Sequence, residues 1–502
     1  MDRCNDMRVW FLVTFFAVFA CVSDGVGTAA AAASNDASGQ ERLYSPEALR
    51  EDLDQMYREL QAAHFDLYAF TTKSELDQRY RQARASLRQP LTLLQAKTQF
   101  QLFAAAVHMG HTRVDSPASD WRRYRQNGGK GFPLQIRVVD GRVYVAENLS
   151  GVDEIKPGDE IKSMDGQSMK RWLERTERHV SAETAGMAHS LMEYDFAIYV
   201  WIELGAAESF DVTIGRSGAA PRRVRLPART SAEMDAARAL QPPSLDLEHP
   251  LRDARIIDHG VAYLRPGPFY NAEAKTEADG WDVSGFRDFI DRSFQTFEAA
   301  HADRLIIDLR GNPGGDNLFS DVLVAWFAKR PFRFASQFKI RVSEESIAAN
   351  QARIDHDAAA AGPISRKYAQ LYAGSHPGEV VDFDIPLAQP RHGAHFDGKV
   401  FVLIDRQSYS NAVAVAALVQ DYGFGLILGE ATSDMATTFG AMEQFSLLHT
   451  GLSVGFPKAR IVRPNGDLRS RGVTPDKPLR IPIVQSPADE VLREAAAIAV
   501  GG

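Results

Sequence analysis

The sequence predicts an α/β protein with a helical N-terminal region and a β-rich middle region. The first observation is a pair of continuous apolar runs, at 305–309 and 400–404, which are typical of strands buried on both faces of a parallel sheet. The second is that a helical pattern follows each run, at 318–329 and 412–422. Alternating strands and helices are typical of α/β domains. The 502 residues are enough for two or three domains.

Composition excludes several classes of function. The net charge of −8 gives no sign of the basic face that nucleic-acid-binding proteins carry, so we expect no nucleic-acid partner. The only two cysteines, Cys4 and Cys21, lie within the first 33 residues. If that segment is removed, the mature chain has no disulfide, no cysteine nucleophile and no thiolate metal ligand.

The N-terminus has the pattern of a secretory signal peptide. A basic flank precedes the apolar run 9–22, which is short for a membrane span, and small residues follow at 28–34. We therefore expect a cleaved signal peptide over 1–33 and a periplasmic or secreted protein. A single membrane anchor is the alternative. Lipid attachment at Cys21 is disfavoured because the bulky Phe19 stands where lipoprotein signals carry small residues.

The chain divides into seven expected segments. They are a signal peptide at 1–33, a linker at 34–44, a helical N-terminal domain at 45–128, a PDZ-like domain at 129–228, a connector at 229–254, an α/β domain at 255–485 and a C-terminal tail at 486–502. The helical domain begins at Ser45, which can cap the free N–H groups of a helix whose first residue is Pro46.

The middle region resembles a PDZ domain. Residues 155–166 combine a Pro-Gly turn, a short strand and an Asp-Gly turn. Strand-like composition at 143–145 and 210–214, and a helical pattern at 169–177, fit the same plan. The resemblance implies that a substrate C-terminus is held by strand addition. A plain β-rich insert is the alternative.

A glycine-rich loop lies between a predicted strand and a predicted helix. Residues 308–315 read Asp-Leu-Arg-Gly-Asn-Pro-Gly-Gly. Glycines let the backbone turn sharply, and free N–H groups at a helix start can bind a developing oxyanion. A phosphate-binding loop is an alternative, but no Gly-Lys-Ser/Thr follows. An ordinary Gly-rich turn is another.

A second strand-to-helix turn carries a serine. Ser410 follows the apolar run 401–404 and precedes the helix that begins near Ala412. At such a turn the hydroxyl is exposed and the N–H of the next residue can help to bind an oxyanion. The alternative role for Ser410 is that of a helix cap.

Several blocks are similar to motifs of the tail-specific (C-terminal processing) serine proteases. Residues 305–315 are similar to the signature LIIDLRxNxGG, and 472–476 resemble the closing GVxPD strand. Residues 409–412, with 420–423 and 429–432 behind them, are similar to the nucleophile segment. The blocks occur in the family's order over about 255–480.

The resemblance implies a Clp-protease/crotonase-like catalytic domain and a serine endopeptidase that cleaves polypeptides without a cofactor. It makes Ser410 the nucleophile and the amides of Gly314 and Asn411 the oxyanion donors. An α/β-hydrolase would show G-x-S-x-G, which is absent around Ser410. An ester substrate on the same site remains an alternative, and the sequence leaves the oligomeric state open.

The general base distinguishes two branches of the family. One branch uses a lysine, and here Met435 occupies that position. The other branch, with interphotoreceptor-retinoid-binding-like and tricorn-like members, uses a histidine in a Gly-His-Thr motif, which 110–112 match. His111 is therefore the expected base. His108 and His111 could instead suggest a zinc pair, but no H-E-x-x-H motif supports it, and no metal is expected.

The acid that would orient His111 is less well defined. The position where the histidine branch often carries a glutamate is Arg469 here. Asp467, two residues away, is the expected substitute, with Glu430 and Glu443 as alternatives and an unassisted Ser–His dyad as a further one. Loss of both the lysine and the usual glutamate also leaves open a catalytically weak or inactive binding protein.

Overall fold

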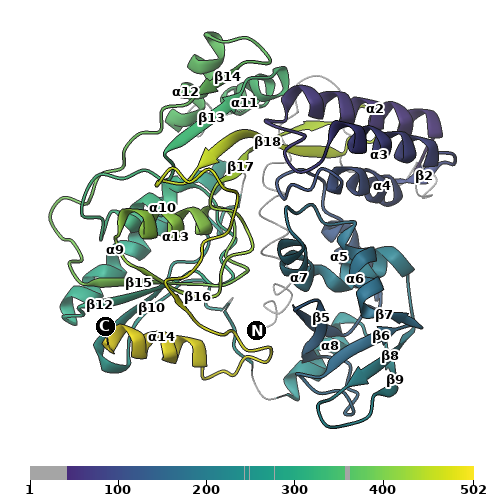
Figure 1. Ribbon diagram of the computed structural model, residues 1–502, viewed down its shortest axis with the longest axis horizontal. Helices are drawn as coiled ribbons and strands as arrows, with labels where there is room; N and C mark the ends of the chain where they lie inside the picture. Colours follow the sequence, from purple (N-terminus) through teal and green to yellow (C-terminus); the bar gives the residue numbers. More distant parts are fainter. Residues whose placement is uncertain (1–41, 242–243, 248, 276–277, 357–361, 502) are drawn as a thin grey trace.

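The computed structural model describes residues 42–241, 244–247, 249–275, 278–356 and 362–501, and these residues form the predicted α/β protein (Figure 1). A helical N-terminal unit, a β-rich unit and an α/β unit meet along the middle of the molecule. The predicted signal peptide and nearly all of the predicted linker lie outside the described residues. Within them, no helix has the length and apolar character needed to cross a membrane.

Helices dominate the N-terminal unit, as the sequence predicts. Its elements are β1 (Leu43–Tyr44), α2 (Pro46–Ala63), α3 (Lys73–Ser86), β2 (Leu91–Thr92), α4 (Leu93–Ala105), β3 (Arg113–Val114) and α5 (Ala118–Gln126). The hydroxyl of Ser45 caps α2, as expected. Strand β3 pairs with β18 (Ser453–Val462) of the α/β unit, with Val114 opposite Val454. This pairing fixes the chain that immediately follows His111.

The β-rich unit has one antiparallel sheet and three helices. Its elements are β4 (Leu134–Val139), β5 (Arg142–Asn148), β6 (Glu160–Met164), β7 (Gln167–Ser168), α6 (Met169–Glu177), α7 (Ala185–Leu204), β8 (Ser209–Gly215), β9 (Arg222–Pro227) and α8 (Ser231–Ala239). The strand order is β4-β5-β6-β8-β9. The predicted strands and helix α6 are present, whereas α7 was not predicted and α8 lies inside the expected connector.

The α/β unit is built on a six-stranded sheet with the order β10-β11-β12-β15-β16-β19. Its elements are β10 (Asp253–Ile257), η1 (Asp258–Gly260), β11 (Val261–Arg265), η2 (Ala278–Trp281), α9 (Ser284–Ala299), β12 (Arg304–Asp308), α10 (Asn317–Val324), β15 (Lys399–Ile404), α13 (Asn411–Tyr422), β16 (Leu426–Gly429), β19 (Lys477–Pro478) and α14 (Glu490–Gly501). All neighbours are parallel except β10 and β11.

Both faces of this sheet are covered by helices, which explains its continuous apolar strands. Leu305 and Ile307 face the side covered by α9, α10 and α13, whereas Ile306 faces α14 (Figure 1). Buried residues of α14, including Leu492, belong to the same apolar cluster as Ile306. The predicted tail at 486–502 is therefore corrected: it carries a helix that completes the core of the α/β unit.

A second sheet joins the α/β unit to the helical unit. Its strands are β13 (Gln337–Arg341), β14 (Val380–Asp382), β17 (Thr438–Ser446) and β18, together with the short β3. Helices α11 (Glu344–His356) and α12 (Gly362–Ala373) lie in the connection between β13 and β14. The strand order is β14-β13-β18-β17. Phe439, Val454 and Phe456 of β17 and β18 pack in one apolar core with helices α2 to α4. This shared core holds the helical unit, and His111 with it, against the second sheet.

Candidate active site

Ser410 occupies a strained turn between β15 and α13. Its backbone angles are φ 52° and ψ −121°, which lie in a region that residues with a Cβ rarely adopt. A sharp strand-to-helix turn of this kind exposes a serine hydroxyl above the sheet. The side chain makes no capping bond to α13, so the alternative role as a helix cap is not supported. Strain is tolerated only where the surroundings over-determine it.

A buried carboxylate holds this turn from below. The Ser410 N–H donates to Asp434 Oδ2 at 2.6 Å, and the Met435 N–H donates to Asp434 Oδ1 at 2.8 Å. Asp434 is fully buried, and burial raises its pKa to about 6. Sequence reasoning missed this residue. Its only signal was its place, two residues after the end of the Gly-Glu-x-Thr block.

Asp434 is itself held by the other family-like blocks. The Thr432 hydroxyl donates to the backbone oxygen of Asp434 at 2.9 Å, and it accepts the N–H of Val473 at 2.9 Å. The segments at 429–432 and 472–476 thus form one chain of hydrogen bonds that ends at Ser410. Distant motifs in the sequence therefore act on one backbone amide.

The glycine-rich loop packs directly against the serine turn. The Tyr409 N–H donates to the backbone oxygen of Asn312 at 2.9 Å. Gly314 has φ 87°, and a Cβ atom placed on it would lie 2.5 Å from the backbone oxygen of Tyr409 and 2.6 Å from the amide nitrogen of Asn411. Only glycine fits such an approach without displacing the turn.

The two predicted oxyanion donors differ in availability. Asn411 begins α13, and its N–H has no acceptor among the described residues, as expected for the first amide of a helix. The Gly314 N–H instead donates to Asn312 Oδ1 at 2.9 Å. The role of Gly314 stays a prediction, because in this structure its amide is occupied by the Asn312 side chain, which also donates to the backbone oxygen of Gly267.

His111 lies beside the serine turn. Its ring stacks on that of Tyr409, the residue before Ser410, with ring centroids 5.8 Å apart. The side chain is buried, and burial together with the charge of Arg113 lowers the pKa of His111 to about 3. Its Nδ1 atom has no hydrogen-bond partner among the described residues. The imidazole is therefore neutral at pH 7.

Glu183, at the start of α7, is a second carboxyl group that sequence reasoning missed. Its Oε2 accepts the N–H of Gly110 at 3.2 Å, and its buried Oε1 has no partner among the described residues. Burial and the nearby charge of Asp434 raise the pKa of Glu183 to about 8. Glu183 therefore touches the residue next to His111. No sequence signal indicated it, because the preceding segment has no strand or helix pattern.

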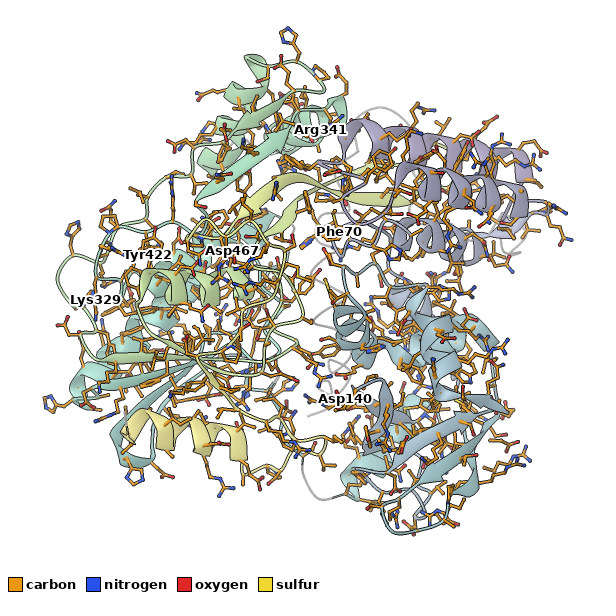
Figure 2. All side chains as sticks on the ribbon, in the orientation of Figure 1. Phe70, Asp140, Lys329, Arg341, Tyr422 and Asp467 are labelled. Atoms are coloured by element: carbon orange, nitrogen blue, oxygen red, sulfur yellow. The ribbon has the colours of Figure 1, made fainter. Side chains whose placement is uncertain are left out.

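The structure does not bring the predicted acids to His111. Asp467 (Figure 2) is bound by Arg469 and Arg471, each at 2.9 Å, and the Arg469 hydrogen bonds are the main cause of its lowered pKa. Since Nδ1 of His111 has no partner within the described ranges, the expected Asp467–His111 bond is absent there.

The two alternative acids are also engaged elsewhere. Glu430 pairs with Arg406 at 3.0 Å. Glu443 pairs with Lys458 and Arg353, each at 2.6 Å; burial alone would raise its pKa, but the two cations outweigh burial and hold it low. Across the described part of the chain, no group of three or more potential ligands is placed to bind a metal ion.

Comparison with known proteins agrees with this geometry. Residues 275–479 match the model of peptidase family S41. No curated protein sequence matches the chain. Mature CPAF complexed with lactacystin superimposes with a TM-score of 0.63 at 16% identity, covering 90% of this chain and 98% of that one.

Of two further structures, mature CPAF alone has the same fold and the other is a more distant match. Mature CPAF alone has a TM-score of 0.62 at 17% identity, covering 91% and 96% of the two chains. The photosystem II D1 C-terminal processing protease has a TM-score of 0.42 at 17% identity, covering 87% and 95%. Residues 275–479 therefore carry a domain of peptidase family S41, and the chain as a whole has the fold of mature CPAF.

Proposed function

We propose that the chain is an exported endopeptidase in which Ser410 attacks the peptide carbonyl and His111 is the general base. The observation that carries this proposal is the strained Ser410 turn with the neutral imidazole of His111 stacked against its preceding residue. A neutral imidazole can take the proton of the Ser410 hydroxyl as the carbonyl is attacked. The same proton then passes to the leaving amine, and water hydrolyses the acyl-enzyme.

The Asn411 amide supports binding of the oxyanion. It lies at the N-terminus of α13, where the aligned peptide dipoles favour negative charge. A second donor from Gly314 requires that Asn312 release its amide. Loss of one such donor in a model serine protease costs about 10²–10³ in turnover, so this release is worth a large part of the rate.

Glu183 is the carboxyl group best placed to position His111. It acts through the Gly110 N–H rather than on the imidazole itself. We expect it to be protonated at pH 7 because its pKa is about 8. The unit then works as a Ser410–His111 dyad whose histidine is positioned by backbone and by the Tyr409 ring. This arrangement belongs to the histidine branch of the family, since the buried Met435 cannot act as a base.

Export and substrate capture complete the proposal. The basic and apolar N-terminal segment supports cleavage of a signal peptide at about residue 33 and a periplasmic or secreted location. The β-rich unit would hold a polypeptide by its C-terminus through strand addition, and its edge strands are β4 and β9. A catalytically weak binding protein is the second candidate, favoured by the unpartnered Nδ1 of His111.

A fluorophosphonate probe tests the proposal. The purified mature protein should be labelled, and labelling should be lost in Ser410→Ala and reduced at least tenfold in His111→Ala. His108→Ala is the matched control, because His108 is exposed three residues earlier and should label as the wild type does. Labelling that survives Ser410→Ala would sink the assignment, and a folded wild type that neither labels nor cleaves casein would favour the binding protein.

A further inference from the structure

A cavity of about 340 Å³ lies where the three units meet. Tyr409 and Gly110 line it, and these residues immediately precede the proposed nucleophile and base. The remaining lining comes chiefly from the segment 113–119, from α7 and from β17 and β18. The cavity therefore lies beside the residues that precede the proposed nucleophile and base.

One face of α7 forms a wall of this cavity. Leu191, Asp195, Tyr199 and Ile202 all line it, and their spacing of four, four and three residues places them on one side of a helix. Three of the four are apolar or aromatic. A single carboxyl group, that of Asp195, stands among them.

The carboxyl group of Asp195 is unusual in its lack of partners. Its buried Oδ1 has no hydrogen bond among the described residues. Burial alone raises its pKa to about 7, with no cation contributing. The Asp195 residue is half-buried, but its Oδ1 atom is fully buried, and a buried oxygen without a partner costs free energy, so natural proteins rarely keep one without a use.

Among the described residues, no other ionisable group of the cavity forms an ion pair with Asp195. Lys97 pairs with Asp120 at 2.7 Å, and His179 with Glu203 at 2.6 Å. Arg113 and Arg122 also line the cavity. Burial lowers the pKa of Arg113 to about 9, opposed by the charges of Tyr409 and Asp115 rather than by Asp195. None of these cations contributes to the raised pKa of Asp195.

We propose that this cavity is a specificity subsite that binds a lysine or arginine side chain of the polypeptide substrate, with Asp195 receiving the charged head. The inference rests on the proposed peptidase function. Both side chains have an apolar stem that suits the wall of Leu191, Tyr199 and Ile202, and a cationic end that would satisfy the Asp195 oxygen. A charged hydrogen bond formed in a buried site is among the stronger ones.

The test maps the bonds that the protein cleaves in reduced casein and in a peptide library that contains every natural amino acid. Cleavage is carried out at pH 8, and the products are identified by mass spectrometry. The wild type should show lysine and arginine enriched at one fixed position relative to the scissile bond. Asp195→Asn should lose that enrichment and lower kcat/KM for basic peptides by about tenfold to a hundredfold, with neutral peptides little changed. Asp195→Lys should shift the preference to aspartate and glutamate.

Two controls separate this inference from the proposed function. Asp211→Asn, an exposed carboxylate on β8, should leave the preference unchanged. The thermal midpoint of Asp195→Asn should equal or exceed that of the wild type, because the carboxylate it removes has no partner for Oδ1. Cleavage that depends on Ser410 but shows no basic preference, or a preference that Asp195→Asn retains, overturns the subsite alone. Absence of any Ser410-dependent cleavage overturns the proposed function instead.

Discussion

The carboxylate of Asp434 accepts the backbone N–H of Ser410 at 2.6 Å, 24 residues along the chain from the serine. This bond fixes the one residue at the site whose backbone angles are strained. It also makes the Ser410 turn depend on Thr432, whose hydroxyl donates to the backbone oxygen of Asp434 and accepts the N–H of Val473. Hydrogen bonds thus join the family-like blocks of the sequence at the Ser410 turn.

Asp434→Ala should lower kcat about 10- to 100-fold with little change in KM, because it frees the Ser410 turn without touching the substrate. The same change leaves two buried amides without an acceptor, so stability should fall by about 2 kcal/mol. Asp434→Asn keeps one acceptor oxygen and should lie between. Steady-state kinetics and thermal unfolding measure both effects. Ser433→Ala is the control; an equal loss of kcat there would show a general loosening of the loop.

Gly314→Ala should abolish Ser410 labelling. The added Cβ would meet backbone atoms of Tyr409 and Asn411 at 2.5 and 2.6 Å, and neither atom can move without displacing the nucleophile. The matched control is Gly141→Ala, which has a similar positive φ of 70° but nothing within 4 Å. That variant should lose only about 1 kcal/mol from backbone strain and keep full labelling. Labelling of Gly314→Ala at the wild-type rate would show that the two loops are not rigidly packed.

The catalytic sheet and the Ser410 turn were predictable because their signals are local. Continuous apolar runs identified β12 and β15, and a serine between strand and helix identified the turn. Helix α7 was missed because it is apolar on nearly every side, with buried residues from Met187 to Val200, and so shows no helical period. Its wall of the cavity was therefore missed too.

The acids could not be assigned because carboxyl partners are set by tertiary structure. Glu183 reaches Gly110 only when the β-rich unit packs against the helical unit, and Asp434 reaches Ser410 only through the fold of the α/β unit. Nothing in the flanking residues marks Glu183. Asp467 had a visible warning, since Arg469 and Arg471 follow at short spacing and bind it in the structure. Because Asp467 pairs with these two nearby arginines, it is not available to orient His111.

Glu183→Gln should keep activity within about threefold at pH 7, because the amide oxygen can still accept the Gly110 N–H. Glu183→Ala, which removes that acceptor, should lower kcat at least about tenfold.

The pKa of Glu183 is raised to about 8 in the folded state, so the folded state binds more protons than the unfolded one from about pH 4.5 to 8. The stability of the protein therefore falls as pH rises through this window.

That loss of stability gives a second readout for Glu183. Glu183→Gln cannot ionise, so its thermal midpoint should exceed that of the wild type at pH 9 and match it near pH 4. Glu174→Gln, an exposed site on α6, should show no such difference. A strong drop in kcat for Glu183→Gln at pH 7 would instead assign Glu183 an ionised role beside His111.

Burial of His111 predicts a pH effect of the opposite sign. Its pKa is about 3 in the folded state against about 6.5 in the unfolded chain, so the unfolded state binds more protons between these values. Stability is therefore lost as pH falls from 6.5 toward 3, by about 2 kcal/mol at pH 5 from this group. His111→Gln should show a smaller fall in thermal midpoint from pH 7 to pH 5 than the wild type. His108→Gln should not, and equal falls in all three proteins would place a charged, solvated imidazole at position 111.

Helix α14 should prove essential to the catalytic core. Leu492 is 7% exposed and packs in the cluster that contains Ile306 and Phe401, so Leu492→Ala should cost about 2–5 kcal/mol. Val500, on the same helix but 38% exposed, is the matched control and should cost less than about 0.5 kcal/mol. The helix start also binds the active-site loop, since Asp489 pairs with the buried Arg310 at 2.6 Å. Asp489→Ala should therefore lower both the thermal midpoint and the rate of Ser410 labelling. If Leu492→Ala and a chain that ends at residue 485 both unfolded at the thermal midpoint of the wild type, residues 486–502 would be a dispensable tail.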